Sequence, residues 1–177
     1  LVYTRRQAER LAERIGSETL IVDYAMNYGN PSIASKIEVL KDKGCEKIAV
    51  IALYPQYSAT TTASVYDRTF RALSKMRWQP AVRTAAQFVD MPDYINALAG
   101  SISDHIAGLD FVPERVLMSY HGVPKAYLDK GDPYHCQCHK TTRLVAEALG
   151  WDSGFAMTTF QSRFGPTEWL QPYTDKT

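Results

Sequence analysis

The sequence predicts an α/β protein whose strands are largely parallel, and two observations predict this class. Helical and strand patterns alternate along the chain, which is typical of parallel sheets whose strands are joined by helices. The strand segments are continuous apolar runs, as expected of strands covered on both faces. With 177 residues, 45% of them hydrophobic and 22% charged, the chain has an ordinary globular composition and enough length for a sizeable core.

The helices are predicted from apolar stripes with the spacing i, i+3, i+4 and i+7, which places side chains on one helix face. Asn30 is expected to cap the second helix, with Pro31 as its first residue. Glycines at positions 16, 44, 108 and 150 end four of the stripes. In chain order, the predicted helices cover about residues 8–15, 31–43, 63–73, 92–107 and 144–149.

The strands are predicted from short runs rich in branched and aromatic residues that lie between these helices. A change of domain is predicted near residues 89–92, although no linker rich in glycine and serine marks it. The predicted strands cover residues 19–25, 47–53, 81–88, 115–120 and 154–160.

Charge and composition exclude several classes of protein. With 20 Lys and Arg against 19 Asp and Glu, the net charge is +1, so no overall field favours nucleic acid. No apolar run reaches the ~18 residues that a transmembrane helix needs. Three cysteines are an odd number, which fits a reducing compartment better than a disulfide scaffold. No signal peptide is recognisable.

Unusual residues follow four of the predicted strands. Ligands of open α/β sheets bind beyond the carboxyl ends of the strands, and parallel strands would bring these segments to one rim. Tyrosines, a histidine and, shortly beyond, Trp169 would line that rim, which suits a large, flat, partly apolar ligand. The four segments are residues 26–29 (MNYG), 54–58 (YPQYS), 121–124 (HGVP) and 161–166 (QSRFGP).

His121 is the sharpest single candidate, because it directly follows a predicted buried strand and precedes a Gly-x-Pro turn. One interpretation is a proton acceptor or metal ligand, since imidazole changes its charge near neutral pH. The other is a histidine that hydrogen-bonds a loop carbonyl. Position alone leaves both open.

Residues 135–139 (HCQCH) are the local cluster that most resembles a metal site. Structural zinc sites usually pair a Cys-x2-Cys with a second, distant pair, and Cys45 is the only other cysteine. The residues His135, Cys136 and Cys138 are therefore left without an assigned role. The sequence also lacks a Gly-x-Ser-x-Gly elbow, a P-loop and a Gly-x-Gly-x-x-Gly fingerprint.

Taken together, the segments resemble the ferrochelatases, the family that inserts ferrous iron into a porphyrin in haem biosynthesis. The resemblance rests on their order and spacing over nearly the whole chain. The matching segments are residues 53–58, 119–124, 131–134 (GDPY), 160–166, 169–170 and 173–175, with a looser match at 25–29.

The resemblance implies two Rossmann-like, chelatase-type halves with parallel sheets flanked by helices, both incomplete here. Residues 1–89 would be part of the first and residues 90–177 part of the second, with porphyrin bound between them. His121 matches the family's catalytic and metal-binding histidine. Positions around the macrocycle are matched by Tyr28, Tyr54, Ser58, Tyr134 and Trp169.

The departures from the family pattern concern the two ends and one cysteine. The family's carboxylate opposite the histidine would lie beyond Thr177, and its N-terminal segment would precede Leu1, so we expect the chain to be an internal part of a longer enzyme. Ala59 stands where iron–sulfur members have a cysteine. No iron–sulfur cluster, and no cofactor beyond the substrate Fe²⁺, is therefore expected.

The expected function is ferrochelatase activity, a lyase reaction with ferrous iron and protoporphyrin IX, or coproporphyrin, as substrates. Two alternatives stay open: a non-catalytic module that binds tetrapyrrole or metal, and a cobalt or sirohydrochlorin chelatase. We expect a cytoplasmic protein, with peripheral membrane association left open because porphyrins are apolar. No nucleic-acid partner is expected, and the oligomeric state is not predicted.

Overall fold

The computed structural model describes all of residues 1–177, and the chain folds into two compact units. The first unit comprises Leu1–Leu53 and Thr60–Ala85, and the second comprises Tyr54–Ala59 and Ala86–Thr177. The segment 54–59 thus belongs to the second unit although its neighbours in sequence on both sides belong to the first. That the chain consists of two chelatase-type domains divided between residues 89 and 90 stays a prediction.

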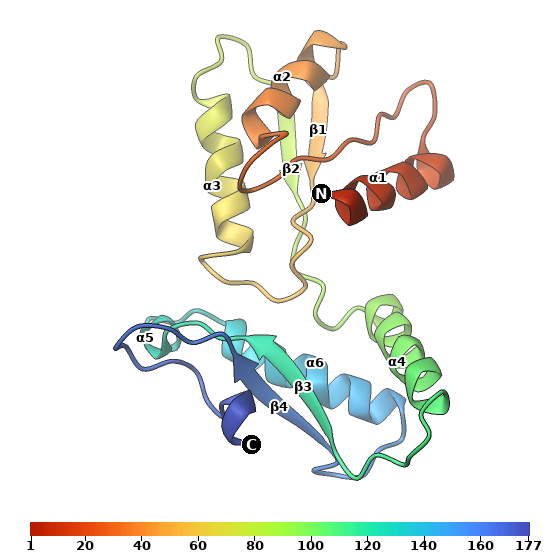
Figure 1. The fold of residues 1–177 in the computed structure, drawn as a ribbon. Helices are drawn as coiled ribbons and strands as arrows, with labels where there is room; N and C mark the ends of the chain where they lie inside the picture. The colour runs from red at the N-terminus through yellow and green to blue at the C-terminus, as the bar shows by residue number, and fades with distance from the viewer. The chain divides into compact units, whose positions relative to one another are not determined.

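The first unit is built around a parallel pair of strands, β1 (Lys47–Val50) and β2 (Ala81–Thr84), with Lys47 opposite Ala81. Its helices are α1 (Val2–Ile15), α2 (Ile33–Asp42) and α3 (Thr62–Leu73). Figure 1 shows α2 and α3 beside the strands. Ile37 of α2, Ile48 of β1 and Leu73 of α3 form its core, so both helices pack on this sheet.

The second unit has a second parallel pair, β3 (Val116–His121) and β4 (Ala156–Gln161), in which Tyr120 lies opposite Phe160 and His121 opposite Gln161. Its helices are α4 (Pro92–Ala107), α5 (Lys125–Asp129), α6 (Tyr134–Ala148) and the short 3-10 helix η1 (Thr174–Lys176). The mixture of helices and parallel two-stranded sheets confirms the predicted α/β class.

Alternation along β3 separates two faces of this sheet. Met118 and Tyr120 face the cores formed with α4 and α6. Ser119 faces the other side, where its hydroxyl lies 2.9 Å from that of Thr174 in η1. In Figure 1, α6 runs behind β3 and β4, and the C-terminal segment lies in front of them. His121 is two residues after Ser119 and therefore shares the η1 face.

Two local predictions for the first unit are wrong. Residues 21–25 form no strand, and Asp23 instead makes an ion pair with Lys36 of α2 at 2.8 Å. The second helix starts at Ile33 rather than Pro31, because Ser32 is its N-cap and accepts a hydrogen bond from the amide of Ser35. The first helix forms as expected but buries none of its residues.

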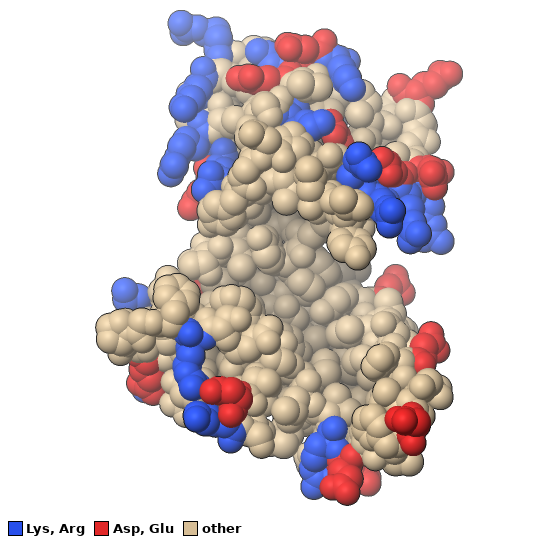
Figure 2. All heavy atoms as spheres, in the orientation of Figure 1, with Lys and Arg blue, Asp and Glu red and all other residues tan.

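Charged side chains are distributed unevenly over the first unit. Figure 2 shows Lys and Arg gathered along α3, with both signs mixed around α1 and α2. None of the helices combines the length and apolar content that a bilayer crossing requires.

Candidate active site

His121 is the last residue of β3, and the pleat of the strand directs its exposed side chain to the η1 face. Its Nδ1 lies 2.7 Å from the carbonyl oxygen of Gly122. A carbonyl oxygen only accepts, so Nδ1 carries the proton and the neutral imidazole has its lone pair on Nε2. Nε2 is therefore the ring atom that can accept a proton or bind a metal ion.

Gly122 is required by close packing against the neighbouring strand and Trp169. Its amide donates to the carbonyl of Gln161 at 2.7 Å. A Cβ at this position would lie 2.9 Å from that carbonyl oxygen and 3.3 Å from Cε3 of Trp169. The absence of a side chain lets the indole approach the residue next to His121.

Trp169 is held in place at three points. Its indole Nε1 donates to the carbonyl of Phe164 at 2.9 Å, and its ring lies 4.9 Å from that of Phe164. Its backbone bridges to Pro124, in the turn after His121. Trp169 is 6% exposed whereas Phe164 is 74% exposed, so Phe164 presents the larger aromatic surface to solvent.

Tyr134 supports the strand end from the helix side. Its hydroxyl donates to the backbone carbonyl of His121 at 3.0 Å, and its amide donates to Oδ1 of Asp132 at 3.0 Å. Burial raises the pKa of the Tyr134 phenol well above its usual range, and nearby Cys138 adds to the shift. The phenol therefore stays a neutral hydrogen-bond donor.

The loop 54–59 is fastened to the second unit through side chains from α6 and the turn before it. Asp132 Oδ2 accepts from the hydroxyl of Ser58 at 2.9 Å and from the amide of Ala59 at 2.8 Å. Two further bonds run from Gln56 Nε2 to Thr141 Oγ1 at 3.0 Å and from the Tyr57 amide to Gln137 Oε1 at 2.7 Å. These bonds explain why the loop belongs to the second unit.

The loop leaves its members unequally accessible. Ser58 is fully buried, whereas Tyr54 at the start of the loop is 37% exposed. The Tyr54 side chain is therefore accessible to a ligand. The buried Ser58 hydroxyl instead fixes the loop through its hydrogen bond to Asp132.

The segment after β4 is fixed by an ion pair and an unusual backbone conformation. Ser162 has φ +68°, the one positive value outside glycine. The guanidinium of Arg163 binds both carboxylate oxygens of Asp175, at 3.0 and 2.9 Å, and lies 4.0 Å from the ring centroid of Tyr173. The segments 160–166 and 173–175 are thereby joined.

Of the six site residues that the sequence predicts, five lie in the second unit and Tyr28 lies in the first. The structure brings together the strand end at His121, its supporting Tyr134, and Trp169. Tyr28 is 66% exposed, and Arg68 lies over its ring at 4.8 Å from the centroid.

The cysteines and histidines of α6 lie on different surfaces of that helix. Cys138 is fully buried, and burial raises the pKa of its thiol to about 12. Cys136 is exposed. The rings of His135 and His139 lie 4.5 Å apart. Burial lowers the pKa of both imidazoles, and the proximity of His135 adds to the shift at His139.

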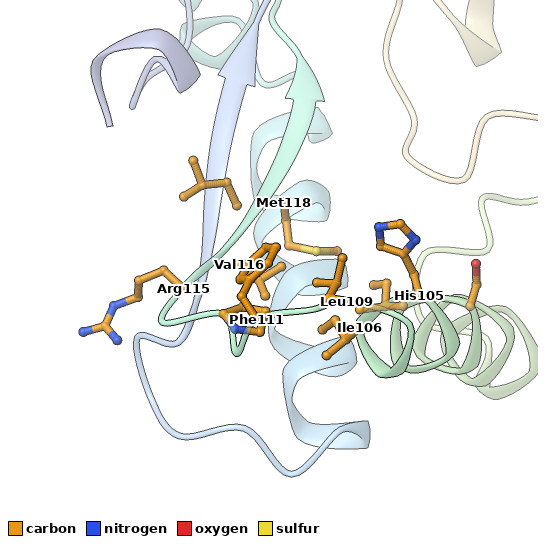
Figure 3. A pocket seen from close by; sticks show the side chains of 11 residues that line it. His105, Ile106, Leu109, Phe111, Arg115, Val116 and Met118 are labelled. Carbon is orange, nitrogen blue, oxygen red and sulfur yellow. The ribbon is translucent and has the colours of Figure 1, made fainter.

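A groove of about 520 Å³ lies elsewhere in the second unit, between the end of α4 and the start of β3. Figure 3 shows Leu109, Phe111 and Met118 grouped at this groove and Arg115 pointing away. It adjoins Val116 to Met118, at the amino end of the strand that His121 terminates. Ligands of parallel sheets bind at the carboxyl end, so the groove is not the candidate active site.

Sequence reasoning missed the residues that fasten the loop, namely Asp132, Gln137 and Thr141. The predicted turn at residues 131–134 carried a partial signal, because an aspartate two residues before a helical amide commonly accepts its hydrogen bond. Nothing local indicated that Asp132 also binds Ser58, which lies 74 positions earlier.

Comparison with known proteins identifies the family of the chain. The family model "Ferrochelatase" matches residues 1–177. The chain is 60% identical over 176 residues to a ferrochelatase of Allorhizobium ampelinum, covering 99% of this chain and 51% of that protein. It is 60% identical to the ferrochelatase of Rhizobium meliloti, covering 99% of this chain and 52% of that protein. It is 58% identical to the ferrochelatase of Mesorhizobium japonicum, covering 99% of this chain and 50% of that protein.

The chain thus spans about half the length of the curated relatives that it matches. Its resemblance to them covers 99% of this chain. The family match over all 177 residues and the identities of 58–60% show that this chain belongs to the ferrochelatase family.

Proposed function

We propose that the full-length protein inserts ferrous iron into protoporphyrin IX, with coproporphyrin as the alternative porphyrin. The observation that carries the proposal is the strand end at His121. There Nδ1 is tied to the Gly122 carbonyl and Nε2 keeps its lone pair. Family membership supports the reaction class.

The reaction exchanges two pyrrole N–H protons for one Fe²⁺ ion, so two protons leave as the metal enters. Nε2 of His121 can accept one such proton, or it can bind the incoming Fe²⁺. One lone pair cannot do both at once. Tyr134 steadies the backbone of His121 through its hydroxyl, so the imidazole is held at the strand end in either role.

The aromatic residues would bind the macrocycle. Tyr54 offers an exposed phenol, and Trp169, which is 6% exposed and lies against Gly122, would contribute the edge of its indole beside His121. Flat aromatic surfaces favour contact with a porphyrin face, and holding the macrocycle bent would expose its nitrogens to the metal. Tyr28 is proposed as a further porphyrin contact contributed by the first unit, and Ser58 as the anchor beneath Tyr54.

The test uses the full-length protein and compares His121→Ala with the wild type. We expect His121→Ala to lose iron insertion while porphyrin binding, followed by quenching of tryptophan fluorescence, changes little. His105→Ala on α4 is the matched control and should keep full turnover. Retained turnover in His121→Ala would overturn the assignment.

The same assay separates the alternatives. If the protein is a binding module, the wild type itself would bind porphyrin without inserting iron. A cobalt or sirohydrochlorin chelatase would metallate sirohydrochlorin with Co²⁺ and leave protoporphyrin unchanged. A ferrochelatase would instead insert Fe²⁺ into protoporphyrin and leave sirohydrochlorin unchanged.

No iron–sulfur cluster and no nucleic-acid partner form part of the proposal. Ala59, whose amide is bound to Asp132, carries no thiol for a cluster. We propose a cytoplasmic enzyme that associates peripherally with the membrane, since its porphyrin ligand is apolar. Cell fractionation tests this: the protein should pellet with membranes and be released by salt or carbonate.

A further inference from the structure

The first turns of α6 carry two histidines that the proposed iron-insertion site does not use. His135 and His139 are spaced i, i+4, so their side chains lie on one face of the helix. Their ring centroids are 4.5 Å apart with an interplanar angle of 53°. Two imidazoles at this separation can present nitrogens to one ion.

Both imidazole rings lie close to a buried aromatic ring. The ring of Phe160, which is 2% exposed, stacks on His135 at 5.7 Å and 19° and lies 6.3 Å from His139. A buried ring beneath the pair restricts the imidazoles before any ligand arrives, which lowers the entropic cost of binding.

The pair is open to solvent on its outer side, since His139 is exposed and His135 is partly exposed. The nearest basic residues along the helix are already engaged. Lys140 pairs with Asp90 at 2.5 Å, and Arg143 pairs with Glu147 at 2.6 Å. These ion pairs compensate the positive charges next to the two histidines.

The chemistry of the ligands selects the kind of ion. Imidazole nitrogens suit divalent transition metals such as Zn²⁺, Ni²⁺, Co²⁺ and Cu²⁺ rather than Mg²⁺ or Ca²⁺. No third His, Cys, Asp or Glu completes a group around the pair. Cys138 is fully buried. A bound ion would therefore keep water in its remaining positions and exchange readily, unlike a closed structural zinc site.

We propose that His135 and His139 form an open two-histidine site for a divalent transition-metal ion. The site lies on the opposite face of the β3–β4 sheet from His121. The histidine pair contacts Phe160, which is paired with Tyr120, whereas His121 is one residue further along β3 and faces the other side. The site does not depend on the proposed iron-insertion function.

The test is calorimetric titration of Ni²⁺ into the full-length protein carrying His121→Ala, which removes the histidine on the other face. One equivalent should bind. Even losing a hydrogen-bond partner of a metal ligand costs roughly 10–100-fold in affinity, so His135→Gln or His139→Gln should weaken binding by at least about tenfold. His105→Gln on α4 is the matched control and should bind as the parent does.

A second readout keeps the test valid if a glutamine variant is less stable. Side-chain imidazole NMR signals of His135 and His139 in the parent protein should shift or broaden together as Ni²⁺ is added. Equal affinity in parent and His139→Gln, or histidine signals that ignore the metal, would overturn the proposal.

Discussion

The hydroxyl of Ser58 donates to Oδ2 of Asp132 at 2.9 Å, joining residues that lie 74 positions apart. The same oxygen accepts from the amide of Ala59, and the other carboxylate oxygen accepts from the amide of Tyr134. A single carboxylate therefore holds both the loop after β1 and the start of α6.

Replacing this carboxylate should loosen the loop. Asp132→Ala removes three acceptor contacts, one of them to the buried Ser58 hydroxyl, and a typical intramolecular hydrogen bond contributes about 0.5–1.5 kcal/mol net. We expect the free energy of unfolding, measured with urea on the full-length protein, to fall by about 2 kcal/mol. Asp129→Ala at the end of α5 should change it by less than about 0.5 kcal/mol. Equal losses in both variants would contradict the anchoring role.

Two glycines give a matched pair of substitutions. In Gly122→Ala the new methyl would lie 2.9 Å from the Gln161 carbonyl, and such overpacking typically costs about 1–3 kcal/mol. In Gly100→Ala, within α4, nothing lies within 4 Å of the new methyl, and alanine should stabilise the helix by roughly 0.5–1 kcal/mol. Thermal unfolding should therefore shift in opposite directions. A stabilising Gly122→Ala would refute the close contact with Trp169.

The backbone of Ser162 predicts a stabilising change. Its φ of +68° costs a side-chain-bearing residue about 1–2 kcal/mol, whereas glycine adds roughly 0.5–1 kcal/mol of unfolded-state entropy. Ser162→Gly should therefore raise the free energy of unfolding by up to about 1 kcal/mol. Ser153→Gly, at a position without positive φ, should lower it. The denaturation midpoint should rise in Ser162→Gly and fall in Ser153→Gly. A fall in both would contradict the positive φ of Ser162.

Cysteine alkylation should separate two thiols on the same helix. Cys136 is exposed, whereas Cys138 is buried with its pKa raised to about 12. At pH 8, iodoacetamide should modify Cys136 and leave Cys138 intact until urea unfolds the protein, as peptide mass spectrometry would show. Rapid modification of Cys138 in the folded protein would contradict its burial.

The same thiol predicts the sign of a pH effect. The unfolded thiol ionises near its ordinary pKa of 9.0, and the folded one only near 12. The contribution of Cys138 to the free energy of unfolding is therefore fully present below pH 9 and is lost as the pH rises towards 12. The unfolding free energy of Cys138→Ala should consequently fall less steeply over that range than that of the wild type.

The α/β class could be predicted because the spacing of apolar residues in helices and the length of apolar runs in strands are local properties of the sequence. The prediction failed at residues 19–25, whose branched residues suggest a strand. A strand also needs a hydrogen-bonded neighbour, and β1 pairs only with β2 in this sheet. Leu20 and Ile21 stay 46% and 41% exposed, and Asp23 turns to Lys36.

For the candidate site, the sequence predicted His121 and Trp169 because each stands in a recognisable segment, and their roles stay a prediction. It could not show that Ser58 would be buried and Tyr54 exposed, since that depends on Asp132 and Gln137 far along the chain. Side-chain accessibility within a loop is decided by such distant partners, which no local pattern contains.

The loop 54–59 has a consequence for biosynthesis. On a ribosome, Gln56 emerges 85 residues before its partner Thr141, a delay of roughly 4–17 s at usual elongation rates of about 5–20 residues per second. During that interval Gln56 lacks the partner that it has in the folded protein. A gene truncated to begin at residue 86 would encode Asp132, Gln137 and Thr141 without the segment that they hold.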